Sequence, residues 1–284
     1  MRRNEIIKFI TGMIEEGGLT FTDYATKLEE IVNKLSLEDI KISLLECGVI
    51  PESFDHDSTE EKLYSKYSDM LLARAFTFIG IDSKVIKERA DSADVEGATK
   101  DYILVADGKV FRLSRTAKNQ KDFKVETLDK WRNGKDFACL VSPLYQYPKN
   151  KSQIYRQAIG RNVTLFSYIH LYFILSQNKP TQFNYKTLWL VGKKLKGAKG
   201  AVSYWKAIDK MLCKILNKSL KELESIKKLE LDLLKESAKE EIAYIEGKIE
   251  TIKSLSHDEA IERLIKAEKL DQKINQITRM ARLK

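Results

Sequence analysis

Residues 102–109 read YILVADGK and are the most informative part of the sequence about the fold. Its first five residues are apolar on both faces, as is typical of a central strand that is covered on both sides. The strand then ends in Asp107 and Lys109. Because side chains alternate along a strand, residues two apart share a face, so this acid and this lysine point the same way. The stretch predicts a buried strand that ends in a charged pair.

Further strands and helices alternate around this stretch. Apolar runs predict two more strands, and capped amphipathic segments predict helices beside them. The predicted strands are 137–141 and 163–166, and the predicted helices are 58–80, 125–134, 151–160 and 168–177. This order predicts an α/β core with a mixed or largely parallel central sheet flanked by helices.

Helical segments flank the predicted core on both sides. Residues 1–57 contain short amphipathic helices, and residues 204–284 contain long helices with apolar residues three to four apart, the last of them over 260–282. We expect one domain over residues 1–284 with its α/β catalytic core at 58–180. Packing of the later helices on the core is favoured over an isolated coiled coil, and a subunit interface fits either arrangement.

The composition suits a folded protein with an anionic partner. The 284 residues carry a formal charge of +9, and 43% are hydrophobic, which excludes wholesale disorder. A basic chain favours nucleic acid as a partner without deciding it. We find neither a signal peptide nor an apolar run that could span a bilayer, so we expect a cytoplasmic protein with no membrane contact.

Cysteine and histidine are sparse. Three of each are scattered without metal-binding spacing, so we expect buried thiols and no zinc site. His170 lies within an apolar run and is predicted to be a hydrogen-bonded core residue. The chemistry of the chain must therefore come from its carboxylates and basic residues.

An Asp-x-Lys pair at a strand end can act on phosphate esters. Carboxylates hold a hard cation such as Mg²⁺, and the lysine supplies a fixed positive charge near water and phosphate. One aspartate is too few, and Asp94 is the expected second one, because the chain between it and Asp107 leaves room for a hairpin-like return. Glu61 fits a capping box with Ser58, which suffices to explain it, and a contribution from Glu61 or Glu88 to the site stays open.

The segment after the strand is a basic ribbon, with Asp122 as its one acid. A basic residue recurs at every third position: Lys109, Arg112, Arg115, Lys118, Lys121 and Lys124. If the segment is extended, Asn119 and Lys121 could face one groove, where asparagine pairs with adenine and lysine with guanine. The flanking Arg112, Arg115 and Lys118 are assigned to phosphates. The ribbon predicts binding to DNA.

Residues 106–109, which read ADGK, resemble the active-site strand of the PD-(D/E)XK nucleases. Residues 111–125, which read FRLSRTAKNQKDFKV, resemble type II restriction endonucleases of that superfamily, as do residues 58–63, 146–148 and 151–154. The resemblance covers roughly residues 40–180. It implies the PD-(D/E)XK nuclease core, a mixed central sheet flanked by helices, with helical elaborations at both ends.

The resemblance also implies an activity and the residues that perform it. It implies a homodimeric, Mg²⁺-dependent enzyme, with Mn²⁺ as a substitute ion, that cuts double-stranded DNA at a palindrome, expected to be AAGCTT. Asp94, Asp107 and the carbonyl of Gly108, which stands where the family has alanine, would hold the metal, and Lys109 would position the attacking water.

By the same resemblance, four further positions take roles at the DNA. Asn119, Lys121 and the backbone of Ala117 would face the major groove, and Asp122 would lie near the cleavage centre as a catalytic residue. The helices before residue 80 and after residue 204 are the candidate dimer interface. A DNA methyltransferase acting on the same site is a possible partner.

Two other functions fit the same residues. One is a repair or recombination nuclease of this fold that recognises DNA structure, and the other is a non-catalytic DNA-binding protein in which Asp107 and Lys109 form a structural pair. Incubation with plasmid and Mg²⁺ separates the three, because they give discrete fragments, structure-dependent nicks, or retarded but intact DNA.

Overall fold

The computed structural model describes residues 2–86, 92–115, 120–149, 152–195 and 200–281. The chain forms two compact units, residues 1–238 and residues 239–284. The first unit contains the sheet and every residue of the predicted site. No described helix is long and apolar enough to cross a membrane.

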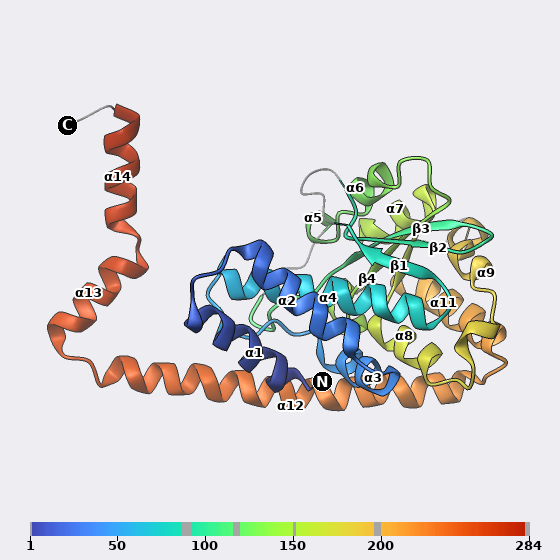
Figure 1. The fold of residues 1–284 in the computed structure, drawn as a ribbon, viewed down its shortest axis with the longest axis horizontal. Helices are drawn as coiled ribbons and strands as arrows, with labels where there is room; N and C mark the ends of the chain where they lie inside the picture. The colour runs from blue at the N-terminus through green and yellow to red at the C-terminus, as the bar shows by residue number, and fades with distance from the viewer. Residues whose placement is uncertain (1, 87–91, 116–119, 150–151, 196–199, 282–284) are drawn as a thin grey trace. The chain divides into compact units, whose positions relative to one another are not determined.

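The first unit alternates strands and helices in its middle part, as Figure 1 shows. The strands are β1 Asp82–Val85, β2 Val95–Ala98, β3 Ile103–Gly108, β4 Phe137–Val141 and β5 Val163–Phe166. The helices are α1 Arg3–Glu16, α2 Phe21–Lys34, α3 Leu37–Glu46, α4 Thr59–Phe78, α5 Gln120–Phe123, α6 Val125–Trp131, α7 Gln153–Arg161, α8 Tyr168–Leu175, α9 Lys186–Trp189, α10 Val191–Lys194 and α11 Ala201–Leu216, with single 3-10 turns η1 Leu144–Gln146 and η2 Pro180–Gln182. Helix α12, Leu220–Lys253, follows.

The central sheet is mixed, as predicted. Its five strands lie in chain order, β1 to β2 to β3 antiparallel and β3 to β4 to β5 parallel. The predicted strands at 137–141 and 163–166 are confirmed residue for residue. Strands β1 and β2 were not predicted as strands, because each is short and only partly apolar.

Helices cover both faces of the sheet at its parallel end. Every residue of β4 and β5 is buried, and since neighbouring residues point to opposite faces, both faces must be covered there. Helix α4 packs against β1, β2 and β3, while α6 packs against β3, β4 and β5. Helices α1, α2 and α3 pack in turn on α4. The long helix α4 thus runs across the strands that carry the predicted site.

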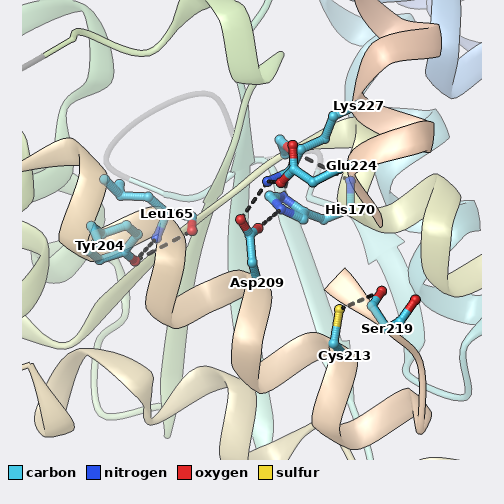
Figure 2. A network of polar contacts seen from close by, with 9 residues as sticks. Leu165, His170, Tyr204, Asp209, Cys213, Ser219, Glu224 and Lys227 are labelled. Carbon is cyan, nitrogen blue, oxygen red and sulfur yellow. Dashed lines mark hydrogen bonds and ion pairs between the residues drawn. The ribbon is translucent and has the colours of Figure 1, made fainter. Parts of the chain in front are cut away.

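A buried polar network joins α8, α11 and α12 (Figure 2). His170 Nε2 lies 2.9 Å from Asp209 Oδ1, and Lys227 donates to the other oxygen of Asp209. The Nδ1 atom of His170 lies 2.6 Å from the hydroxyl of Ser167. Although serine, histidine and aspartate also serve in hydrolases, Ser167 and His170 are fully buried here, so no substrate can reach them. The prediction of a hydrogen-bonded core histidine is confirmed, and the three cysteines are buried free thiols as predicted.

The second unit contains the end of α12 and two further helices, α13 His257–Ala267 and α14 Leu270–Ala281. The single last helix predicted over 260–282 is wrong, because the chain takes a left-handed conformation at Lys269, with φ 54°. Ser256 and Glu259 form the capping box that starts α13. Large apolar side chains of these helices are exposed, including Ile249, Leu264, Ile274, Ile277 and Met280. Packing on the core is confirmed for α11, whose Tyr204, Ile208 and Leu212 are buried, and stays a prediction for α13 and α14.

Candidate active site

The antiparallel pairing of β2 with β3 brings Asp94 beside Asp107. Val95 pairs with Ala106 across the two strands, so the residue before β2 lies opposite the residue after Ala106. The backbone carbonyl of Asp94 accepts a hydrogen bond of 2.8 Å from the amide of Ile86, which holds the start of β2 in place. The hairpin-like return expected from the spacing of these acids is confirmed.

Asp107 and Lys109 point to one side of β3, as the alternation of side chains predicts. The ammonium of Lys109 donates to Asp107 Oδ1 over 2.5 Å, and the amide of Lys109 donates to the carbonyl of Val141 over 2.8 Å. Asp107 is fully buried, whereas the side chain of Lys109 keeps 20% of its exposure. The pair therefore lies at the point where the core meets solvent.

Helix α4 adds two charged residues that the sequence analysis did not identify. The Lys66 ammonium lies 3.4 Å from Asp69 Oδ2 and 3.6 Å from Asp94 Oδ1. Asp69 is 4% exposed, which is unusual for a charged residue in the middle of a helix. The sequence holds a signal for the burial of Asp69, because this residue stands directly before the apolar residues 70–73 and so faces the core side of the helix. The site thus contains three carboxyl groups and two lysines.

Burial and mutual repulsion govern ionisation in this cluster. Burial raises the pKa of Asp107 to about 7, against the opposing charge of Lys109. Burial and the nearby Asp94 raise the pKa of Asp69 well above its ordinary value, although Lys66 opposes them. For Asp94, burial is outweighed by the hydrogen bond with Asp107 and by the charges of Lys109 and Lys66, so its pKa is lowered. Asp94 therefore loses its proton readily, whereas Asp69 and Asp107 hold theirs to higher pH.

Lysine 109 stays charged in this setting. Burial alone would lower its pKa, but the carboxyl groups of Asp107 and Asp94 outweigh burial and raise it. A protonated lysine can donate hydrogen bonds and stabilise negative charge. The raised pKa thus suits Lys109 to orienting and stabilising groups at the site.

The arrangement of oxygens fits a divalent cation. Asp107 Oδ2 is buried, and no donor group of the described residues reaches it. The carboxyl group of Asp94 lies within hydrogen-bonding reach of that of Asp107, a contact that two carboxyl groups share only with a proton or a cation between them. Hard oxygen ligands of this kind are those that Mg²⁺ and Mn²⁺ prefer. Asp94 and Asp107 are the residues that could hold such an ion.

The cluster opens into a cavity of about 770 Å³. Its lining includes Lys66, Asp69, Asp94, Lys109, Arg112 and Arg115. Acidic residues and basic residues of the predicted ribbon thus line one cavity. A polyanion bound to its basic residues would lie close to the carboxyl cluster.

Glu61 lies on this cavity, and its predicted contact is different in the structure. Ser58 caps α4, but the Glu61 carboxylate accepts a 2.6 Å hydrogen bond from the amide of Asp57 instead of that of Ser58, so the capping box is incomplete. Its other oxygen accepts from Arg112 over 3.3 Å. The ligand atoms of His56, Asp57 and Glu61 lie within 4.8 Å of one another, but His56 and Asp57 are exposed and Glu61 is already engaged. We therefore assign Glu61 to holding Arg112.

Arg112 itself is tightly held. It donates to the carbonyl of Pro51 over 3.0 Å as well as to Glu61, and its side chain is 14% exposed. The ribbon is also tied down at Phe111, whose carbonyl accepts hydrogen bonds from Ile50 and Gln146. These contacts fix residues 109–112 against the loop before α4. A phosphate could therefore reach Arg112 only through the small part of its side chain that is exposed.

The outer ribbon is not extended where the structure describes it. Lys121 and Asp122 lie in the one-turn helix α5, so the extended arrangement is wrong for residues 120–123. Asp122 forms an ion pair with Arg115, on the side of the cavity, and Lys124 precedes α6 in a left-handed conformation. Ala117, Lys118 and Asn119 lie outside the described residues, as does Glu88. The structure brings Asp94, Asp107 and Lys109 together, and its contacts place Asp122 with Arg115.

Gly108 leaves space that its neighbours fill. A Cβ atom at this position would lie 3.0 Å from Asp69 Oδ1 and 3.2 Å from the hydroxyl of Tyr168. Both neighbours are buried and cannot move freely. Gly108 thus leaves room for the carboxyl group that α4 brings next to β3.

Comparison with known proteins extends the resemblance to the whole chain. A model of the HindIII restriction endonuclease family matches residues 4–281, including both helical parts. The chain is also 34% identical over 286 aligned positions to the type II restriction enzyme HindIII of Haemophilus influenzae, covering 98% of this chain and 95% of that protein. The chain belongs to the HindIII restriction endonuclease family.

Proposed function

We propose that the protein is a type II restriction endonuclease that uses Mg²⁺ to hydrolyse double-stranded DNA at a palindromic site, AAGCTT. The observation that carries the proposal is the convergence of Asp94, Asp107 and Lys109 on one side of the β2–β3 pair, in a cavity flanked by arginines. Family membership supports the same activity. As a basic protein, the enzyme has the charge to collect on DNA before it reaches its site.

In this proposal Asp94, Asp107 and the carbonyl of Gly108 hold the metal ion. When bound, the ion supplies Lewis acidity and lowers the pKa of water. Lys109 holds the attacking water and neutralises charge that develops on the phosphate, a role that suits its raised pKa. Water forms a new P–O bond, the ester P–O bond breaks, and the leaving oxygen takes up a proton.

The sequence AAGCTT is proposed from residues 117–122. This segment resembles the family where bases are read, and Lys121 is exposed on α5. Asn119 and the backbone of Ala117 are proposed to face the same groove. Arg115, Lys118 and Lys124 are proposed to bind phosphates, and Asp122 to act near the cleavage centre through its ion pair with Arg115.

The active unit is proposed to be a homodimer. Each chain offers one such site, and a palindrome is read most simply by a protein with matching two-fold symmetry. Exposed apolar side chains of α14 repeat on one face at Leu270, Ile274 and Ile277, which is the pattern of a helix that packs on a partner. A DNA methyltransferase that protects the same site is the expected companion enzyme.

Plasmid cleavage tests the activity directly. The purified protein is incubated with supercoiled plasmid and either Mg²⁺ or excess EDTA, and Asp107→Asn serves as the matched control. Discrete linear fragments in Mg²⁺ alone support the proposal. Nicks at sites set by DNA structure would indicate a repair or recombination nuclease. DNA that is retarded in the gel but intact would indicate a non-catalytic DNA-binding protein, in which Asp107 and Lys109 form a structural pair.

A further inference from the structure

Lys66 contacts the proposed metal ligand Asp94 from outside the sheet. It lies on α4, and its ammonium lies 3.6 Å from Asp94 Oδ1 and 3.4 Å from Asp69 Oδ2. Its side chain is 34% exposed and lines the cavity, so it has room to turn toward a ligand there. Neither Asp-x-Lys chemistry nor the proposed function assigns it a role.

The charge of Lys66 opposes a cation at Asp94. Its ammonium pairs with the carboxyl groups of Asp69 and Asp94, and a lysine is positively charged at neutral pH. A protonated lysine has no lone pair and cannot be a metal ligand. A divalent ion on Asp94 would therefore meet a like charge only a few ångströms away, at a distance where Coulomb repulsion is large even at intermediate dielectric.

A DNA phosphate removes this opposition. The phosphate is an anion that enters the same cavity, and the flexible stem of a lysine allows its ammonium to follow the anion away from Asp94. Once it has turned, Asp94 is released and the repulsion is replaced by attraction between ion, phosphate and ammonium. Asp69 is buried and pairs with Lys66, so it keeps the lysine side chain close to the cavity when the ammonium leaves Asp94.

We propose that Lys66 is a positioning residue that holds Asp94 until a DNA phosphate displaces it, and so couples metal binding to DNA binding. This inference rests on the proposed function, in which Asp94 is a metal ligand. It makes two predictions that a purely structural lysine would not satisfy. Removing the charge strengthens metal binding in the absence of DNA, and it weakens DNA binding in the absence of metal.

The experiment measures Mn²⁺ binding to the full chain without DNA, by electron paramagnetic resonance of the free ion. We compare the wild-type protein with Lys66→Met, Lys66→Arg and Asp94→Asn. A further control is Lys62→Met, because Lys62 lies one turn earlier on α4, lines the same cavity and makes no ion pair with a described residue. Thermal unfolding of each variant shows that it is folded at the temperature used.

The expected result is that Lys66→Met binds Mn²⁺ at least about tenfold more tightly than the wild type, while Lys66→Arg and Lys62→Met bind it as the wild type does. In EDTA, Lys66→Met also binds duplex DNA more weakly, with a salt dependence reduced by about one unit of slope. Unchanged or weaker Mn²⁺ binding by Lys66→Met overturns the inference, as does an equal gain in Lys62→Met.

Failure of the underlying function would look different. If Asp94→Asn bound Mn²⁺ as tightly as the wild type, the assignment of Asp94 as a ligand would fail, and the role of Lys66 with it. If Asp94→Asn lost the ion while Lys66→Met gained nothing, only the role of Lys66 would fail.

Discussion

Asp107 is a fully buried carboxyl group whose outer oxygen has no donor among the described residues. Burial of such a group is unfavourable unless it is compensated, and here one lysine compensates one of its two oxygens. A buried oxygen without a donor lowers the stability of the fold but is free to bind a cation. Asp69 on α4 is a second buried carboxyl group, and Lys66 pairs with it.

Replacing either member of the Asp-x-Lys pair should abolish cleavage. Asp107→Asn and Lys109→Met each remove a preorganised charge at the reacting phosphate, so we expect the rate of plasmid cleavage to fall roughly a hundredfold or more. Gel retardation should show DNA binding largely retained, because the arginines along the cavity are untouched. A variant that cuts at near wild-type rate would remove that residue from the mechanism.

Gly108→Ala should destabilise the protein by roughly 1–3 kcal/mol, because its Cβ would press on Asp69 and Tyr168. The control is Gly160→Ala in α7, where nothing lies within 4 Å of a new Cβ, so the helix should gain roughly 0.5–1 kcal/mol. Urea unfolding measures both changes. A stabilised Gly108→Ala protein would show that Asp69 is not confined as described.

Among the elements, the β2–β3 pair and α4 build the site together. The strands could be predicted where they are buried on both faces, because β4 is a continuous apolar run and β5 is interrupted only by Thr164. Asp94 could be predicted because a hairpin is a local event. Lys66 and Asp69 could not, since no local pattern tells which helix crosses which strand end.

Two other differences have local physical causes. Residues 120–123 form a helical turn because Phe123 must be buried, where its ring packs against those of Phe111 and Tyr147. The last helix breaks at Lys269 without a glycine or proline to announce it. Charge spacing alone could not predict the backbone conformation of residues 120–123.

Glu230 on α12 makes stability depend on pH. Burial raises its pKa to about 7, against an ordinary value of 4.5, although a hydrogen bond from the backbone of Leu144 opposes this. The folded protein therefore binds a proton that the unfolded chain has released, so stability is full below about pH 4.5 and falls as pH rises through 7.

Glu230→Gln should remove this loss, since an uncharged amide can still accept the backbone hydrogen bond. We expect the variant to match the wild type at pH 5 and to exceed it at pH 8 by roughly 1–3 kcal/mol in urea unfolding. Glu15→Gln, at an exposed position of α1, should leave the pH dependence unchanged. A variant that is no more stable than the wild type at pH 8 would contradict the assignment.

At the scale of the whole molecule, the proposed function requires the one carboxyl cluster found in the described part of each chain to serve two DNA strands. The exposed apolar face of α14 is the surface we assign to the second copy. Ile274→Lys combined with Ile277→Lys should convert the dimer to a monomer in sedimentation velocity, and double-strand cuts should become nicks. Asn275→Lys, on the same helix at a polar position, should leave the dimer intact.

Two results would contradict this assignment. A dimer that survives the double substitution would place the interface elsewhere, with the helices before residue 80 as the alternative. A wild-type monomer that cuts both strands in one binding event would exclude the dimer altogether.

The central claim is that this carboxyl cluster cuts DNA at one palindrome. The most direct measurement is digestion of a long, fully sequenced DNA with the purified protein and Mg²⁺, followed by sequencing of every fragment end. We expect all ends to map to AAGCTT, and no ends to form with excess EDTA or with Asp107→Asn. Ends scattered over unrelated sequences, or cleavage that persists in Asp107→Asn, would contradict it.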